Sequence, residues 1–348
     1  MSPRNPRRDV VIQSTKQGLV FVLDRETGRP ALPVEERKAP QGGAAGEVLS
    51  PTQPFPADLP ALGDDRVRPE DAFGLTPWDR DACAKAIAAS RSEGRFTSPS
   101  EQGTLEMPFD REHALVFANT SNMIHLITLF SAAQFAEFKA RFPGKEISPQ
   151  TGAPFGMMRE VLLSPIGLPC NPPPWGTLSA IDLNSRKILW QTPLGTTEAM
   201  NPLGLARRLG TPTLGGPLAT SGGLVFIGAA MDDYLRAFDA KTGAELWTGR
   251  LPATGNSTPT TYEWQGRQYV VIAAGGRGET GSPANDALVA FALPRLGEST
   301  PSPWVSWTDK PGGRFKLHAG MVAVALVAAL VLLTSWRGRR RRRAQAAR

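Results

Sequence analysis

One pattern recurs along the chain and restricts its fold more than any other feature: short strands, an Asp-containing turn and a further strand that ends in tryptophan. In the fullest copy, residues 223–254, the runs 224–227 and 234–238 are rich in β-branched and aromatic side chains. A polar turn at 239–243 then leads into a third run that ends at Trp247. Runs of this kind joined by short polar turns predict an antiparallel meander.

The pattern is a repeat. Asp182 precedes Trp190 by eight residues, as Asp239 precedes Trp247, and the two aspartates are 57 residues apart. A third copy at 21–28 lacks the tryptophan. In the fullest copy, Asp239 can accept bonds from the backbone ahead of it, and Gly243 accepts the positive φ that a Cβ penalises. Repeats of this size predict an all-β protein, a β-propeller, of which about four blades form part of a ring.

The propeller portion is assigned to residues 10–297, after a polar start at 1–9 that has no apolar stretch and is therefore not a signal peptide. We expect sequence upstream of this start. Insertions rich in Pro and Gly are expected at 29–95 and 131–175. The long polar stretches 29–75 and 145–175 inside them show little periodicity and are expected to be irregular.

Two helices and one tight turn are predicted in the first half. Residues 10–24 predict two strands joined by a turn that contains Lys16. Thr76 followed by Pro and Asp predicts a helix start, with the helix running to about Ser92. Ser131 is expected to cap a second short helix that ends near Arg141.

The end of the chain predicts a membrane anchor. After a polar linker at 298–316, residues 317–336 are almost entirely apolar, and about 20 such residues span a bilayer core. The Arg-rich tail 337–348 favours a cytoplasmic C-terminus and a periplasmic propeller at the inner membrane. Without the seven tail arginines, 32 basic residues face 32 acidic ones, so no nucleic-acid partner is expected. A buried helix with a nucleic-acid-binding tail is the less favoured interpretation.

Cysteine and histidine give little information. Cys83 and Cys170 are the only cysteines; in an exported domain they could pair or stay free, and the sequence leaves this open. His113, His125 and His318 have no metal-ligand spacing, which argues against a metal hydrolase, and no metal ligands are predicted.

Six segments of this chain occur in an order that is known from one family. They include Ser-Thr-Lys-Gln-Gly at 14–18 and Thr-Ser-Pro-Ser-Glu-Gln-Gly at 97–103, and the full set is 14–28, 51–56, 96–105, 163–170, 214–223 and 269–276. Together they resemble the C-terminal portion of the membrane-bound pyrroloquinoline quinone (PQQ)-dependent dehydrogenases of the glucose, quinate and shikimate group. The resemblance implies an eight-bladed periplasmic propeller that uses PQQ and Ca²⁺, oxidises a sugar, a polyol or a cyclic hydroxy acid, and passes electrons to ubiquinone.

The resemblance also implies roles for four residues. Lys16 corresponds to a lysine that contacts the quinone oxygens, where a cation is useful because negative charge develops as hydride arrives. Asn119 and Asp232 correspond to residues that line the cofactor pocket. Arg277 stands where glucose-oxidising members carry a histidine near the substrate. It could pair with the carboxylate of quinate or shikimate, or be an ordinary surface arginine.

The resemblance has departures. The family's general-base aspartate, the tryptophan under the quinone and the calcium ligands all lie upstream of the lysine turn, so no catalytic residue is identified here. We therefore expect poor PQQ binding and no dehydrogenase activity from this chain alone, with an upstream propeller half as a possible partner. The C-terminal anchor is also unusual, since the glucose enzymes anchor through N-terminal helices. The alternative function is a non-catalytic, membrane-anchored propeller scaffold for protein interactions.

Overall fold

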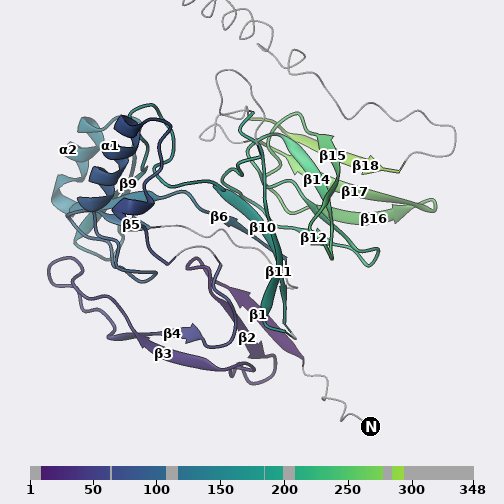
Figure 1. Ribbon diagram of the computed structural model, residues 1–348, viewed down its shortest axis with the longest axis horizontal. Coiled ribbons are helices and arrows are strands. Elements are labelled where there is room, and N and C mark those ends of the chain that lie inside the picture. Colours follow the sequence, from purple (N-terminus) through teal and green to yellow (C-terminus); the bar gives the residue numbers. More distant parts are fainter. Residues whose placement is uncertain are drawn as a thin grey trace, which may run out of the picture. The chain divides into compact units, whose positions relative to one another are not determined.

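The computed structural model describes residues 9–62, 65–106, 117–183, 185–198, 208–276 and 284–293. By its internal contacts the chain divides into two units, and all helices and strands below belong to Met1–Thr196 together with Arg208–Leu293. Strands dominate this unit (Figure 1). The sequence-based prediction of a sheet-dominated fold is therefore confirmed for the described ranges.

The described strands form six antiparallel sheets. Two have four strands, β5–β7–β9–β8 and β12–β13–β14–β15; two have three, β11–β10–β6 and β16–β17–β18; and two are hairpins, β1–β2 and β3–β4. The strand bounds are β1 Val10–Ser14, β2 Val20–Asp24, β3 Val34–Lys38, β4 Thr52–Pro56, β5 Thr104–Glu106, β6 Phe117–Ser121, β7 His125–Ser131, β8 Glu146–Pro149, β9 Phe155–Val161, β10 Gly176–Asp182, β11 Lys187–Pro193, β12 Leu218–Ala219, β13 Leu224–Ile227, β14 Tyr234–Asp239, β15 Glu245–Arg250, β16 Thr260–Trp264, β17 Arg267–Ala274 and β18 Ala287–Ala292. The number of blades in a closed ring stays a prediction.

The repeated turn has the expected chemistry. Asp239 Oδ1 accepts bonds from Lys241 N at 2.9 Å, Thr242 N at 2.8 Å and Thr242 Oγ1 at 2.9 Å. These bonds stabilise the carboxylate and lower the pKa of Asp239. In the first copy, Asp24 Oδ1 accepts the equivalent bonds from Thr27 N at 2.9 Å and Thr27 Oγ1 at 2.8 Å. The turn predicted from the sequence is confirmed in both copies.

The fourth residue after each aspartate takes a positive φ. Gly28 and Gly243 have φ of 69° and 71°, and Arg186 occupies the same place after Asp182 with φ of 60°. A non-glycine residue rarely adopts this conformation. Arg186 N donates to Asp182 O at 2.6 Å, as the two glycines donate to their aspartates at 2.9 Å. The turn geometry is therefore kept even where the glycine is replaced.

Each tryptophan of the repeat contacts the next sheet along the chain. Trp190 of β11 donates from Nε1 to Ala240 O at 3.1 Å, in the turn after β14. The ring of Trp247 in β15 lies 5.0 Å from that of Phe291 in β18, nearly perpendicular to it. Both tryptophans follow a β-bulge, at Leu189 and Leu246, where the strand register shifts. The repeat is thus a docking device between neighbouring sheets.

Replacing Gly243 with alanine is expected to destabilise the protein by about 1–3 kcal/mol, because the residue has positive φ and faces an aromatic ring. A Cβ at this position would lie 2.5 Å from Trp190 Cε3. Urea denaturation measures the loss. The matched control is Gly28→Ala, which has the same φ but nothing within 4 Å of its Cβ. Equal losses in the two variants would show that the Trp190 contact contributes nothing.

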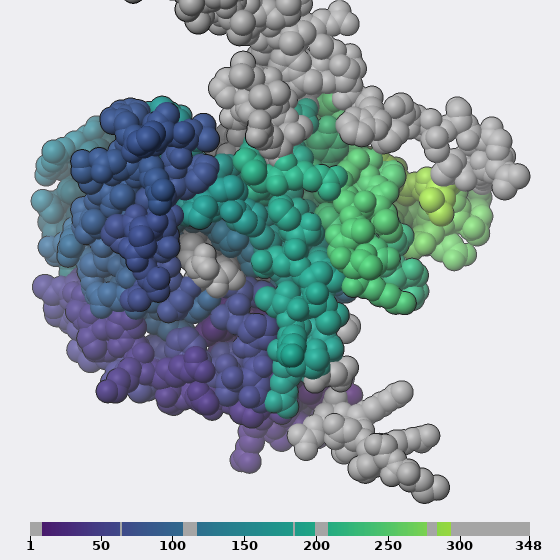
Figure 2. Space-filling model, viewed as in Figure 1, coloured from purple at the N-terminus to yellow at the C-terminus, as the bar shows by residue number. Residues whose placement is uncertain are grey.

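Neighbouring sheets share apolar cores. Leu178 and Leu194 from the β10–β11 region pack with Val225, Ile227 and Phe238 of β13 and β14. A second core joins the β1–β2 hairpin to the β6–β10–β11 sheet, and a third joins β14–β15 to β17–β18. Figure 2 shows the teal surface of β10 and β11 meeting the green surface of β12–β15. Chain order is therefore also packing order for these four sheets.

Helix α1 (Pro77–Ala88) begins where the sequence predicts. Thr76 Oγ1 accepts from Asp79 N at 3.1 Å, and the helix ends four residues before Ser92. A disulfide links Cys83 of this helix to Cys170, with both residues 1% exposed. The pairing that the sequence left open is therefore formed, and it fastens the first insertion to the second.

Three local expectations are wrong. The stretch 29–75 contains the β3–β4 hairpin and a 3₁₀ turn, η1 (Pro69–Asp71), and 145–175 contains β8 and β9. These strands were missed because β3 carries charged side chains on both faces and β9 is half-buried on both, so neither alternates clearly. Ser131 makes no side-chain capping bond; it ends β7, and η2 (Ala132–Gln134) leads into α2 (Phe135–Arg141).

No helix in the described part of the chain is long and apolar enough to cross a membrane. The predicted anchor at 317–336, its linker and the Arg-rich tail lie outside the described residues.

Candidate functional site

Lys16 lies in the turn between β1 and β2, and the backbone of this turn is fixed on both sides. Thr15 N donates to Leu19 O, and Gly18 N to Thr15 O, both at 2.9 Å, while Gly18 has φ of 69°. Leu62 N donates to Gly18 O at 2.8 Å. The Lys16 side chain is exposed and forms no hydrogen bond or ion pair with another described residue. A fixed backbone therefore presents a free ammonium group.

Asn119, in the middle of β6, is 1% exposed. Its Nδ2 donates to Thr213 Oγ1 and to Gly215 O, both at 3.0 Å. Its Oδ1 is buried and has no hydrogen-bond partner among the described residues. A buried amide oxygen without a donor is costly, so this atom can accept a bond from a ligand or a water molecule.

Asp232 is fully buried and its carboxylate is already engaged. It accepts from Thr196 N at 2.6 Å and Thr196 Oγ1 at 2.9 Å. Both oxygens also accept from Arg236, which is 3% exposed, in a bidentate pair. Burial would lower the pKa of Arg236, but the Asp232 carboxylate, with help from Glu245, raises it above its usual value. Asp232 is thus the counter-ion of a buried arginine.

The structure brings Asn119 and the neighbourhood of Asp232 to one segment, residues 211–215. Asn119 contacts Thr213, and Met231, next to Asp232, donates from its backbone to Thr211 Oγ1 at 3.0 Å. No contact joins Lys16 to Asn119 or Asp232 within the described ranges. The convergence of all three in one pocket stays a prediction, and Arg277 lies outside the described residues.

Lys16 instead lies near an acid–base pair that sequence reasoning missed. Glu106 ends β5 and is the cross-strand partner of His125 at the start of β7. Burial raises the pKa of Glu106, and the positive charges of Arg159 and Lys16 partly offset this. Burial and then Arg159 lower the pKa of His125, whose Nδ1 lies 3.2 Å from Met123 O. The two residues are 19 apart in sequence, so only the strand register could have shown the pair.

Replacing Glu106 with glutamine is expected to make the protein relatively more stable as pH rises. The folded-state pKa of Glu106 is raised above its ordinary value of 4.5, so its stabilising contribution is present below that pH and is lost as pH rises through the folded-state pKa. Urea midpoints measured between about pH 4 and pH 8 test this. Glu101→Gln, an exposed turn residue, is the control. A Glu106→Gln variant whose stability relative to wild type falls or stays constant as pH rises would contradict the expectation.

Arg236 could have been found from the sequence. It interrupts the apolar run of β14, and Asp232 precedes it by four residues. Beyond Asp232, its Nε lies 3.5 Å from Glu245 Oε2, and the other oxygen, Glu245 Oε1, accepts from Arg208 at 2.9 Å. A charge within an otherwise apolar strand indicates a buried partner.

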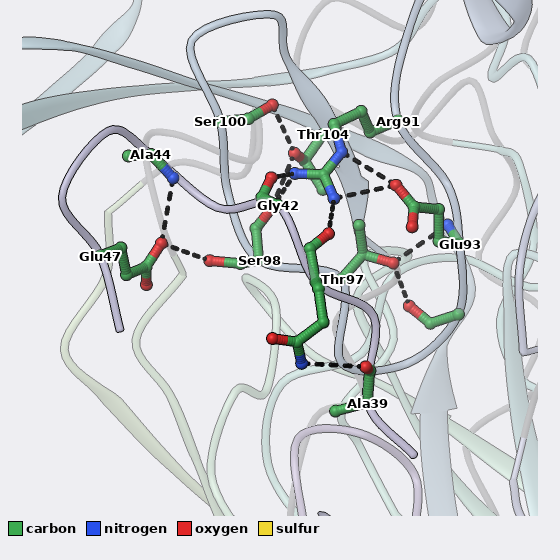
Figure 3. Close-up of polar contacts among 12 residues, drawn as sticks. Ala39, Gly42, Ala44, Glu47, Arg91, Glu93, Thr97, Ser98, Ser100 and Thr104 are labelled. Carbon is green, nitrogen blue, oxygen red and sulfur yellow. Dashed lines mark hydrogen bonds and ion pairs between the residues drawn. The ribbon is translucent and has the colours of Figure 1, made fainter. Parts of the chain in front are cut away.

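A hollow near α1 has a different character. Residues of the loop at 41–45 and of the 100–102 turn line it, together with Arg91 and Glu93. Figure 3 shows that the Arg91 guanidinium points at Gly42, Ser98 and Glu93. Because Arg91 already donates to these groups, its guanidinium group stabilises the loops that line the hollow.

The cofactor implied by the sequence fits these residues in part. Lys16 offers a cationic donor of the kind that a quinone oxygen accepts, and Asn119 keeps one buried acceptor free. Asp232 Oδ2 accepts from Thr196 and Arg236 together, whereas Oδ1 accepts from Arg236 alone and so keeps one acceptor position. No group of three or more metal-ligating side chains occurs in the part of the chain that the structure describes.

Comparison with known proteins matches residues 1–270 to the PQQ family model described as "Glucose/ethanol/alcohol dehydrogenase, beta-propeller domain". The chain is 38% identical over 307 residues to quinoprotein glucose dehydrogenase of Escherichia coli, covering 82% of this chain and 38% of that protein. It is 38% identical over 308 residues to a probable quinate dehydrogenase (quinone) of Xanthomonas campestris pv. juglandis, covering 82% and 39%. The chain therefore spans about two fifths of the length of these relatives.

A solved structure with a related description is quinohemoprotein alcohol dehydrogenase from Comamonas testosteroni. It is 22% identical, with a TM-score of 0.38, over 77% of this chain and 32% of that one. At that TM-score the superposition carries no argument, and the family model is the finding that matters.

Proposed function

Because the chain belongs to the PQQ-dependent glucose/ethanol/alcohol dehydrogenase β-propeller family, we propose that it forms part of a quinoprotein dehydrogenase that oxidises a CH–OH group. The relatives named for glucose, quinate and glycerol support a sugar, a polyol or a cyclic hydroxy acid as the substrate class. The observation that carries the proposal is the exposed ammonium of Lys16 on a fixed turn.

In this proposal each residue has a separate task. PQQ, when bound, supplies the acceptor for the hydride of the alcohol carbon. Lys16 donates to a quinone oxygen, where an ammonium group stabilises developing negative charge. Asn119 contributes its free Oδ1 to the cofactor pocket, and Asp232 supports that region through Arg236. Arg277 is the proposed substrate contact, where a guanidinium group would favour a carboxylate-bearing substrate such as quinate over glucose.

We also propose a periplasmic propeller at the inner membrane, anchored through 317–336, with the tail in the cytoplasm and ubiquinone as electron acceptor. The Cys83–Cys170 disulfide supports an oxidising compartment, because disulfides persist outside the cytosol. Calcium is proposed as the metal on family grounds, with an upstream propeller half as the partner that holds it.

A titration of the purified chain with PQQ and Ca²⁺, followed by cofactor absorbance, tests the proposal. We expect weak but saturable binding, and a dissociation constant about tenfold higher in Lys16→Ala, because a charged hydrogen bond is lost. Lys241→Ala, another exposed turn lysine, is the matched control. Absence of saturable binding, or equal effects of the two substitutions, would overturn the proposal and favour the non-catalytic scaffold.

Dye reduction with glucose, quinate, shikimate and glycerol then tests turnover. No turnover is expected from this chain alone, because no general base is identified in it, and general-base help is worth roughly 10²–10⁴-fold. Turnover with any of the four would contradict that expectation and would identify the substrate.

A further inference from the structure

Arg95 is a buried arginine in the loop that follows α1. Its side chain is 5% exposed. Arginine is rarely buried without partners, since removing its charge from water costs several kcal/mol. The groups that it contacts therefore indicate what the residue is for.

The partners of Arg95 join the Lys16 turn to a distant segment. Its Nη1 donates to Gln17 O, the carbonyl directly after Lys16, and to Leu62 O at 3.3 Å. Its Nε lies 3.5 Å from Asp65 Oδ1, which also accepts from Arg95 N at 3.3 Å. One guanidinium group thus joins the Lys16 turn to Leu62 and Asp65.

The backbone carbonyls of Thr15, Gln17 and Gly18, which flank Lys16, each accept a hydrogen bond. Thr15 O accepts from Gly18 N within the turn, Gly18 O accepts from Leu62 N, and Gln17 O accepts from Arg95. Of these donors only Arg95 is charged, and hydrogen bonds from charged groups are roughly twice as strong as neutral ones. The Lys16 side chain stays exposed. Arg95 therefore restrains the backbone of Lys16 and leaves the ammonium group free.

We propose that Arg95 is a positioning residue for Lys16: it holds the turn so that the ammonium group is presented in one place to the quinone, without touching the cofactor itself. This inference rests on the proposed function of Lys16. Arg95 acts through the Gln17 carbonyl, so its loss should change where Lys16 lies while leaving the lysine chemically intact.

A neighbouring arginine provides a matched control. Arg91 has a side chain that is 13% exposed and also donates to backbone carbonyls, those of Gln41 at 2.9 Å and of Gly42. Figure 3 shows these contacts on the loop beside Glu47 and Ser98. Arg91 is also mostly buried and lies in the same region of the chain, but its partners are Glu93, Ser98 and the 41–42 loop and not the Lys16 turn.

The test is a double-mutant cycle on PQQ affinity in the full chain. Arg95→Met is expected to weaken binding about tenfold, as Lys16→Ala does, and the double variant to bind no worse than Lys16→Ala alone. Arg91→Met should leave the affinity within about twofold of wild type. Additive effects of Arg95→Met and Lys16→Ala would overturn the proposal, because a merely structural role does not couple to Lys16.

A second readout does not need the cofactor. The lysines are ¹³C-methylated, and the Lys16 resonance is identified by its loss in Lys16→Ala. Arg95→Met should shift or broaden that resonance, and Arg91→Met should leave it unchanged. An unaltered Lys16 signal in folded Arg95→Met contradicts the positioning role, whereas a shifted signal in a chain that binds no PQQ contradicts only the proposed function. If Arg95→Met does not fold, Arg95→Lys, which keeps the charge but loses the planar fork, is read in the same way.

Discussion

Replacing Arg236 with methionine is expected to lower the free energy of unfolding by about 3–5 kcal/mol, because it leaves the Asp232 carboxylate buried without its counter-ion. The side chains of this pair are 4% and 0% exposed. Methionine has a similar length but neither charge nor donors, so the Asp232 oxygens would keep only their bonds to Thr196. Guanidinium chloride denaturation followed by circular dichroism measures the loss.

The matched control for this change is Arg208→Met. Arg208 also pairs with an acid of the same network, Glu245 at 2.9 Å, but its side chain is 67% exposed. Exposed ion pairs contribute about 0–1 kcal/mol, so this variant should stay close to wild type. Similar losses in both variants would mean that burial of the Arg236–Asp232 pair does not decide its contribution.

This network also changes how an Asp232 variant must be interpreted. An Asp232→Ala protein that fails to bind PQQ would be expected whether or not Asp232 touches the cofactor, because Arg236 would be left buried and unpaired. The double variant Asp232→Asn/Arg236→Met removes both charges together and is the more informative one. If it folds and still binds PQQ as wild type does, Asp232 is not a cofactor ligand.

Removing the disulfide, as Cys83→Ala/Cys170→Ala, is expected to cost about 2–5 kcal/mol. The bond joins residues 87 apart, and both sulfur atoms lie in an apolar core that also contains Ile87 of α1 and Ile124. The crosslink restricts the unfolded chain, and the substitution also leaves small gaps in that core. Urea denaturation with and without reductant provides the measurement.

Reductant supplies the internal control for the disulfide. Since the chain has only two cysteines, reduced wild type should approach the double variant in stability, and the variant itself should not respond to reductant. If the urea midpoint of the wild type does not change with reductant under unfolding conditions, the disulfide does not form in solution.

Local features of the fold could be predicted because local chemistry decides them. The Asp239 and Asp24 turns depend on residues within four positions of each other, and Thr76 caps α1 through Asp79, three residues away. The strands β3 and β9 could not be predicted in the same way. Strand β3 is exposed on both faces and β9 is half-buried on both, so no alternation of apolar and polar residues records which face is inside.

In the candidate site, too, local features could be predicted and long-range contacts could not. The position of Lys16 in a turn follows from its neighbours, but the contact of Arg95 with Gln17 spans 78 residues. The bidentate Arg236–Asp232 pair lies at a spacing of four and was visible in principle. The resemblance to a family implied a cofactor role for Asp232. Its burial and its bonds show that it is also the counter-ion of Arg236.

The contact of Trp190 with the turn after β14 implies a constraint on how such a protein can gain sheets during evolution. The sheet β12–β15 carries both parts of such a contact: Gly243, which leaves room for the indole ring of Trp190, and Trp247, which contacts the next sheet. A duplicated sheet could be inserted between two others only if it brought both parts. Because the two parts lie in a single stretch of chain, one duplication event copies them together, and the junctions on either side are compatible from the start.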